Sequence, residues 1–371
     1  MRVPSSRLAA AIVGLVSLAS AAAVLADDDV RAGILLRYDT DTTEVISPHA
    51  RGRFRVLDEH THVDLEYTAD IWTSASIDVR TAATVAVTEQ RDEINAGVDR
   101  ELGDVTLRGG YRFSIEHDYQ AHGGVLGLAH DFADNNATID VMLRAEYDAV
   151  TRSGDTRFSR ELAVFGGRAT YTQVIDPQML VQGAFELSYL SGFQSSPYRY
   201  VGIGGDGRCG GTAQLCVPEA HPGSRVRSAL VLRARRALTE QLSLHADYRF
   251  YVDDWAVYSN TAALQLNWSP DERTLVAFRY RFYQQGPAWF YRSVYALGPE
   301  PLVYASRDRE LSQLWTHRLA VSFERSIDLA EAGPTMRIGA ALAGTYIGYD
   351  DFVGLSEVMA VDLTVDVGVE L

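Results

Sequence analysis

The chain has no lysine and only two cysteines among its 371 residues. All 34 basic residues are therefore arginine, and 49 acidic residues outnumber them. Without Arg2 and Arg7 of the N-terminal segment, the balance is 32 − 49 = −17. Nucleic-acid binding depends on neutralising phosphates, so a chain this acidic is a poor candidate for it. No linker, low-complexity tract or shift in composition divides the chain, which favours one domain after residue 26.

Long apolar runs are also absent, with one exception near the N-terminus. Arg2 and Arg7 precede an apolar run from Leu8 to Leu18, and small residues follow up to Ala26. This order is typical of a secretory signal peptide, which we place at residues 1–26; the run is short for a membrane anchor. No later stretch approaches the ~18 apolar residues of a membrane-spanning helix. If residues 27–371 cross a membrane, they must do so as a closed barrel.

The last eleven residues alternate without interruption. Val361, Leu363, Val365, Val367, Val369 and Leu371 fall on one side, and Asp362, Thr364, Asp366, Gly368 and Glu370 fall on the other. A period of two residues predicts a β-strand with one apolar and one polar face. Together with a secretion signal, such a strand indicates an outer-membrane β-barrel whose apolar face meets lipid and whose polar face lines a lumen.

Sixteen alternating segments follow one another through the chain. They span residues 31–39, 43–56, 60–72, 84–100, 104–117, 120–132, 136–149, 158–175, 178–192, 224–237, 240–253, 256–269, 273–286, 309–327, 334–349 and 357–371. The predicted fold is all-β: a closed antiparallel transmembrane β-barrel of about sixteen strands, with fourteen as the nearest alternative.

The lengths of the connections support this fold. Every long connection follows an odd-numbered segment, at 73–83, 150–157, 193–223, 287–308 and 350–356, and every connection after an even-numbered segment is short. Outer-membrane barrels have short periplasmic turns and longer external loops. An even number of strands with both termini in the periplasm places every long connection after an odd-numbered strand. The architecture of a soluble β-sandwich does not require such a pattern.

Four stretches resemble an uncharacterised family, a domain of unknown function, of Gram-negative outer-membrane β-barrel proteins. They are Thr73-Ser-Ala-Ser-Ile-Asp-Val79 running to Glu89-Gln-Arg-Asp-Glu93, Asp131-Phe-Ala-Asp-Asn-Asn136, Gly192-Phe-Gln-Ser-Ser-Pro-Tyr198, and Tyr280-Arg-Phe-Tyr-Gln-Gln-Gly-Pro-Ala-Trp-Phe-Tyr291. The resemblance implies a barrel of this size and an outer-membrane location. It implies no substrate, reaction or catalytic residue.

Charged residues are concentrated on the predicted lumen faces. The acidic ones come from the first half of the barrel: Asp64, Glu66, Asp70, Glu93, Asp99, Asp140, Glu146 and Asp148. The basic ones come from the tenth to fourteenth segments: Arg227, Arg233, Arg235, Arg249, Arg279, Arg281 and Arg318. An acidic wall opposite a basic wall would set the selectivity of a water-filled pore. The alternative is that these groups pair with one another and fill the lumen.

Other chemistry is weakly represented. Cys209 and Cys216 lie seven residues apart in a glycine-rich loop, which in an exported protein favours a disulfide over a metal site. His317 falls on an apolar face, where an interface role is more natural than catalysis. The pairs Asp253-Asp254 and Asp350-Asp351 lie at predicted external tips, where a divalent cation or simple solvation is possible. We predict no catalytic residue, metal or cofactor, although a hydrolase at the rim stays open.

Two functions of different kinds fit these patterns. One is a porin-like channel or binding barrel for small hydrophilic solutes. The other is a structural or assembly barrel whose lumen is filled by its own side chains and which docks a partner protein. In both cases the expected location is the outer membrane of a Gram-negative bacterium, with termini in the periplasm. The expected partners are outer-membrane lipid, lipopolysaccharide and the barrel-assembly machinery, which would bind the C-terminal strand.

Overall fold

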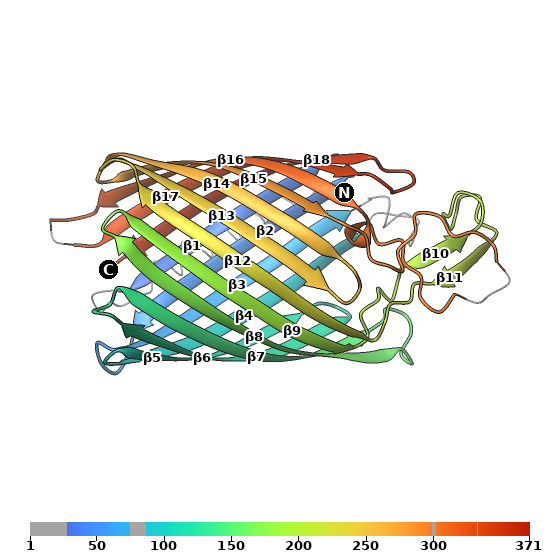
Figure 1. Cartoon of the computed structure of the whole chain (residues 1–371), viewed down its shortest axis with the longest axis horizontal. Helices are drawn as coiled ribbons and strands as arrows, with labels where there is room; N and C mark the ends of the chain where they lie inside the picture. Colours follow the sequence, from blue (N-terminus) through green and yellow to red (C-terminus); the bar gives the residue numbers. More distant parts are fainter. Residues whose placement is uncertain (1–27, 75–86, 299–301, 332) are drawn as a thin grey trace.

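A computed structural model describes residues 28–74, 87–298, 302–331 and 333–371 of the chain. It contains a closed barrel of sixteen antiparallel strands (Figure 1), so the predicted fold class and strand number are confirmed. The signal peptide predicted at 1–26 and most of the loop predicted at 73–83 lie outside the described residues. No helix in the described ranges is long and apolar enough to cross a membrane.

The barrel strands coincide with the sixteen predicted segments to within a few residues. They are β1 (Asp29–Asp39), β2 (Thr43–Arg55), β3 (Thr61–Ser74), β4 (Val87–Leu102), β5 (Val105–Ile115), β6 (Tyr119–Phe132), β7 (Ala137–Thr151), β8 (Ser159–Asp176), β9 (Met179–Gly192), β12 (Ser224–Ala237), β13 (Leu242–Asp253), β14 (Tyr258–Asp271), β15 (Thr274–Gln285), β16 (Leu314–Asp328), β17 (Thr335–Tyr349) and β18 (Glu357–Glu370). Each strand pairs with its neighbour in sequence, except that β9 pairs with β12, and β1 closes the barrel against β18.

The largest difference from the prediction is at the start of β16. The alternating segment was expected from residue 309, but Arg309–Leu311 form a 3-10 turn, η1, and the strand begins at Leu314. The Asp308 carboxylate accepts a hydrogen bond from the Glu310 backbone N–H and caps this turn. Sequence periodicity also missed a small hairpin inside the loop 193–223, formed by β10 (Tyr200–Ile203) and β11 (Leu215–Pro218).

The exposure of the side chains agrees with the apolar and polar faces predicted for the strands. On β18, Met359, Val361, Leu363, Val365 and Val367 are 40–54% exposed, whereas Asp362 is 4% exposed. The same alternation places Leu, Val, Ile, Phe and Tyr side chains outward on most strands. A barrel that presents such an apolar exterior and a polar interior is built for lipid outside and polar contents inside.

Tyrosine and histidine side chains form polar contacts on this exterior. The Tyr280 hydroxyl lies 2.6 Å from His317 Nδ1, and the His317 ring packs against Phe282 and Trp315. His317 is therefore exposed on the outer face of β16 among aromatic residues, which is the kind of environment found at a membrane interface.

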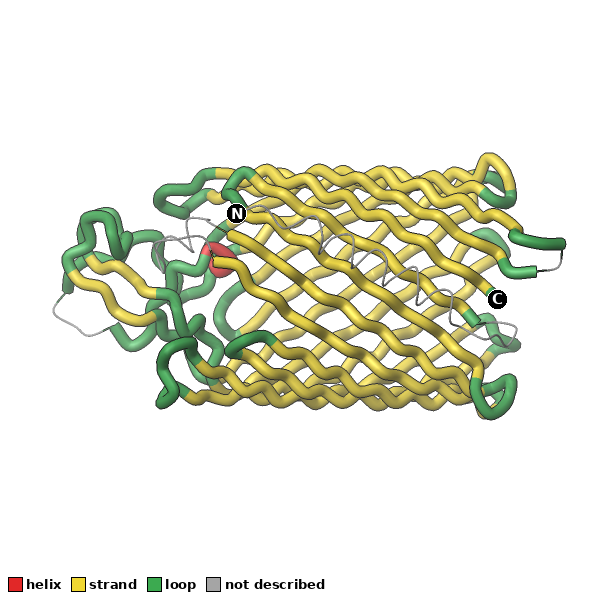
Figure 2. Tube along the Cα trace, turned by 180° about the vertical axis from the view of Figure 1, so that it is seen from behind, coloured by secondary structure: helices red, strands yellow, loops and turns green. Residues whose placement is uncertain are grey.

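The long connections lie at one end of the barrel and the short turns at the other, as Figure 2 shows. The longest described loops, 193–223 and 286–313, lie at the end opposite the C-terminus (Figure 1). Their apolar side chains form two buried clusters, to which the β13–β14 and β17–β18 connections also contribute. The larger contains Trp255, Val257, Ala288, Phe290, Tyr291, Leu311 and Phe352, and the smaller contains Val201, Ile203, Tyr295 and Ala305. These loops thus pack into a folded structure, which we call the cap.

Candidate functional site

The acidic residues predicted for the lumen have partners that the sequence did not reveal. Arg53 donates to Asp64 at 2.8 Å and lies 3.0 Å from Asp99. Arg112 lies 2.8 Å from Glu93 and 2.9 Å from Glu146. Arg91 pairs with Asp70 and Arg108 with Asp140. The first half of the lumen is therefore an ion-pair network and not a purely acidic wall.

Two acidic residues have other surroundings. The Tyr119 hydroxyl donates to Asp148, which is 2% exposed. Glu66 on β3 stands opposite Arg51 in the register with β2. Cross-strand and diagonal pairs of this kind depend on register, so alternation alone cannot identify them.

The basic residues divide into two groups. Arg249 lies 3.2 Å from Glu186, Arg279 lies 3.1 Å from Asp247, and Arg318 pairs with Asp362. Arg233 donates to Gln182 at 2.9 Å and lies 3.9 Å from Asp247. The other group is Arg227, Arg235 and Arg281, and no described carboxylate lies within ion-pair distance of them.

Two further lumen arginines, on β7 and β8, share this property. Arg144 has no ion pair within the described ranges, and Arg168 donates through Nε to Thr170 Oγ1 at 3.2 Å. Arg144 was visible in the sequence as a polar-face residue, but nothing local distinguished it from the paired arginines. Its proximity to the β12 arginines follows from the order of strands β7, β8, β9 and β12.

Arg144, Arg168, Arg227 and Arg249 line one cavity of about 390 Å³ on the lumen wall. Glu186 and Ser188 of β9 and Tyr251 of β13 complete its polar lining. A second cavity of about 360 Å³ lies below the cap, where Asp308, Glu310 and Leu311 approach the wall. Arg227, Arg249 and Tyr251 line both cavities, so the two are neighbours along the lumen.

The cap is fastened to the barrel rim by polar contacts. The Tyr198 hydroxyl donates to Asp118 in the β5–β6 turn, and Arg309 lies 2.7 Å from Asp41 in the β1–β2 turn. Gln285, at the end of β15, donates to the carbonyls of Glu310 and Ser312, both at 2.7 Å. These contacts reach several parts of the rim, so the cap narrows this mouth of the barrel.

A buried polar cluster joins the two cap loops. Ser306 Oγ donates to Glu219 Oε1 at 2.6 Å, and Arg199 lies 3.3 Å from Glu219 and 2.6 Å from Asp308. His221 Nε2 lies 3.4 Å from Glu219 Oε1. The serine hydroxyl contacts the carboxylate and not the imidazole, so this group lacks the Ser–His–acid order of a hydrolase.

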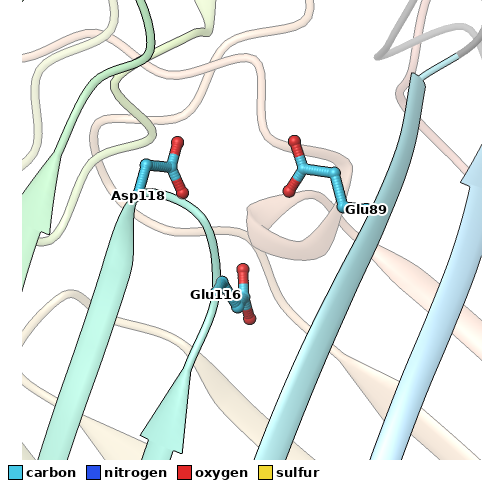
Figure 3. Close-up of side chains that lie close together, drawn as sticks. All are labelled: Glu89, Glu116 and Asp118. Atoms are coloured by element: carbon cyan, nitrogen blue, oxygen red, sulfur yellow. The ribbon is translucent and has the colours of Figure 1, made fainter.

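Three carboxylates meet at the same mouth: Glu89 of β4, and Glu116 and Asp118 of the β5–β6 turn (Figure 3). Their nearest oxygens lie within 4.8 Å of one another, and in the described part of the chain this is the only group with the spacing of a metal site. Burial raises the pKa of Glu116; the Arg91 charge opposes this, and the charges of Glu89 and Asp118 add to it. Such oxygen groups suit hard divalent cations, but shared protons also hold them together.

Three of the four aspartates considered from sequence as pairs, Asp253, Asp254 and Asp350, have carboxylates that the protein engages. Arg225 Nε donates to Asp253 at 2.8 Å, and the backbone N–H groups of Trp255 and Val257 donate to the same carboxylate at 3.0 Å. Asp254 accepts from the Val226 backbone N–H at 3.0 Å, and Asp350 accepts from Gln313 at 2.8 Å. These carboxylates stabilise turns and are not open ligands. Sequence reasoning missed the Glu89–Glu116–Asp118 group because Glu89 lies on β4, far in sequence from the β5–β6 turn that holds the other two.

The Cys209–Cys216 disulfide predicted from spacing is present, with the two Cα atoms 5.8 Å apart. It joins the loop between β10 and β11 to β11, within the hairpin that Figure 1 shows projecting beyond the barrel. The disulfide therefore constrains the outer part of the cap and has no contact with the lumen arginines.

A family described as "Protein of unknown function (DUF3570)" matches residues 161–333. This range includes two of the four stretches that carried the resemblance, 192–198 and 280–291, and it confirms the resemblance over that part of the chain. None of the curated proteins matches the chain.

Solved structures with a similar fold are outer-membrane proteins. A bacterial polysaccharide outer membrane secretin has a TM-score of 0.54 at 10% identity, covering 94% of this chain and 100% of its own. OprD of Pseudomonas aeruginosa has a TM-score of 0.46 at 9% identity, covering 93% and 95%. At these sequence identities the similarity concerns the fold alone, and the assignment of the fold rests on the match to the secretin. The chain has the fold of an outer-membrane β-barrel.

Proposed function

We propose that this barrel, which matches a family of unknown function, is an outer-membrane channel for small hydrophilic solutes and prefers anions. The observation that carries the proposal is the excess of arginine over carboxylate around the 390 Å³ lumen cavity. Four guanidinium groups face a single carboxylate there, Glu186. Fixed positive charge in a narrow polar passage raises the local concentration of anions.

The number of strands supports a channel as well. Barrels of sixteen strands are usually wide enough to leave water in the lumen, whereas eight-stranded barrels are filled by side chains. The neighbouring cavities that share Arg227, Arg249 and Tyr251 offer a polar route from below the cap into the barrel. We place the short turns and both termini in the periplasm, since this is the usual arrangement of such barrels.

The structural barrel remains the second candidate, and a specific observation favours it. The ion-pair network of β2 to β7 occupies much of one side of the lumen, and the cap narrows the mouth. A barrel of this kind would conduct no ions and would display its cap to a partner. In either function, contacts with lipopolysaccharide and the barrel-assembly machinery follow from the location and are part of the proposal.

Conductance in planar lipid bilayers tests the channel. The full chain without its signal peptide should give stable conductance steps, and the reversal potential in a salt gradient should indicate anion preference. Arg281→Gln should shift that potential toward cation preference because Arg281 has no described carboxylate partner. The double variant with Arg279→Gln should add little, since Arg279 is paired with Asp247.

Arg236→Gln is the matched control, because Arg236 lies on the outer face of β12, 3.6 Å from Asp176. It removes the same charge without changing the lumen. Wild-type protein that inserts but never conducts would contradict the channel and leave the structural barrel. Wild-type conductance without anion preference would contradict the proposed selectivity, and equal selectivity in Arg281→Gln and Arg236→Gln would mean that Arg281 does not contribute to it.

A further inference from the structure

We propose that Arg144, Arg168, Arg227 and Arg249 form a binding subsite for the oxyanion group, carboxylate or phosphate, of a small solute. The inference deepens the proposed channel function by naming the class of solute. It also assigns this cavity a binding role that measurements other than conductance can detect.

The strand register places two of these arginines in one row across the wall. Arg144 of β7 is opposite Gly166 of β8, Gly166 is opposite Ser188 of β9, and Ser188 is opposite Arg227 of β12. Three strand spacings separate the outer members of this row, about 14 Å between their backbones. Small residues occupy the two positions between them, so the long arginine side chains have free space above the wall.

The position of Arg144 shows how this space is used. A Cβ atom added at Gly166 would lie 3.0 Å from Arg144 Nε and 3.3 Å from its Cγ. The Arg144 side chain therefore runs over Gly166, toward β9 and β12. Any larger residue at 166 would have to displace it, so the bare glycine is what lets the guanidinium lean toward Arg227.

The next two rows supply the other two guanidinium groups, Arg168 in the first and Arg249 in the second. Arg168 is opposite Glu186, and Arg249 lies 3.2 Å from the Glu186 carboxylate. The Arg249 guanidinium also lies over the Tyr251 ring, 5.4 Å from its centre. Glu186 is thus the single carboxylate lining a cavity that holds four arginines, and it orients one of them.

Arg227 gives the strongest indication of a ligand. Its Nε is buried, and no acceptor among the described residues meets it. Arg225 and Arg144 are near enough to repel its charge, and Asp253 is near enough to attract it but forms its ion pair with Arg225. A half-buried guanidinium whose Nε has no acceptor, and which lies near other guanidinium groups, is costly unless something compensates it. Many other arginines of this lumen are paired with carboxylates, as Arg53 and Arg112 are, so we infer that an anion from outside provides the compensation here.

The chemistry of the cavity narrows the class of anion. Guanidinium groups bind carboxylates and phosphates through paired hydrogen bonds, which gives them geometric preference as well as charge. A volume of about 390 Å³ admits a small molecule and excludes a folded chain. Met142 and Val125 add apolar surface at one side, which suits a small organic anion.

Isothermal titration calorimetry on the detergent-solubilised full barrel, with inorganic phosphate and citrate at constant ionic strength, tests this site. Wild type should bind at least one of the two. Arg227→Gln and Arg144→Gln should each weaken binding by about tenfold or more, the effect of losing one charge-assisted contact. Gly166→Val should weaken it as well, although the variant keeps every charge.

Arg235→Gln is the control, because Arg235 is also a β12 lumen arginine without a described carboxylate partner but does not line this cavity. It should bind like wild type. Absence of binding in wild type would overturn the site, and so would equal losses in Arg235→Gln and Arg227→Gln, which would mean diffuse attraction only. Binding without conductance would contradict the channel and not the site, whereas conductance without binding would contradict the site alone.

Discussion

The surroundings of each residue in this barrel depend on the face of the strand on which it lies. Val365 is 41% exposed on the outer side of β18, whereas its neighbour Thr364 points to the lumen between Asp362 and Asp366. The two positions are adjacent in sequence, yet one is expected to meet lipid and the other water and carboxylates. A charge should therefore have opposite consequences at the two positions.

We predict that Val365→Arg destabilises the folded barrel by about 2–4 kcal/mol, the usual effect of arginine near the middle of a bilayer. Thr364→Arg should be tolerated, because its guanidinium would lie near Asp362 and Asp366. Urea-dependent folding into lipid vesicles measures both, and each variant serves as the charge-matched control of the other. Equal free energies of unfolding for the two would mean that the faces are assigned wrongly.

At the scale of elements, a cluster of charges joins the cap loops, in addition to their apolar clusters and the β10–β11 hairpin. Glu219 is buried between Ser306, Arg199 and His221, and the His221 ring packs against Trp255 and Phe290, with ring centres 5.3 Å away in both cases. Burial alone would raise the pKa of Glu219, but the His221 contact, the Arg199 charge and the Ser306 hydroxyl together lower it below its usual value.

Because the pKa of Glu219 is lowered in the folded cap, its ionised form stabilises the cap at pH values above the ordinary pKa of a glutamate. This contribution is lost as the pH falls through the lowered pKa. We predict that the cap loosens in acid while the barrel persists. Limited proteolysis of loops 193–223 and 286–313 from pH 7 downward, with an acid-active protease, should show cleavage increasing as the pH falls.

Glu219→Gln should make the cap loops easier to cleave at neutral pH and should flatten the pH dependence. Asp134→Asn, in the short turn at the other end of the barrel, should leave both unchanged; asparagine tolerates the positive φ of 53° found there. A Glu219→Gln variant with wild-type cleavage at every pH would mean that the cluster does not hold the loops together.

At the scale of the whole molecule, the even number of strands brings both ends of the barrel sequence to one rim. β1 pairs with β18 along its length, and the Leu371 backbone N–H donates to the Asp28 carbonyl at 2.9 Å. The short turns share this rim, and the cap occupies the other. A membrane around the barrel would therefore separate two surfaces of very different size.

We predict that the cap faces the cell exterior. An epitope inserted after Gly154, in the loop between β7 and β8, should be accessible to antibody on intact cells. An epitope in the 133–136 turn between β6 and β7 should become accessible only after the outer membrane is permeabilised. The reverse pattern would contradict periplasmic termini, and access to both on intact cells would contradict insertion in the membrane.

The sequence by itself determined the strands, their faces and the parity of the connections. Alternation is a local property with a period of two residues, and it survives in any barrel, so all sixteen strands could be located from it. The Cys209–Cys216 disulfide was equally local, since seven residues separate the two cysteines. The hairpin that contains it was missed, because β10 and β11 have four residues each and show no clear period.

Only the tertiary structure decided which charges meet. Asp64 and Asp99 share Arg53, and Arg144 leans over Gly166 toward Arg227, because the register aligns residues far apart in the chain. A shift of the strand register by two residues would keep every side chain on the same face of its strand but would change every cross-strand pair. Alternation therefore carries no information about pairing. The cap likewise depends on contacts between distant loops. The physical reason is the same in both cases: faces follow from local geometry, whereas partners follow from closure of the whole barrel.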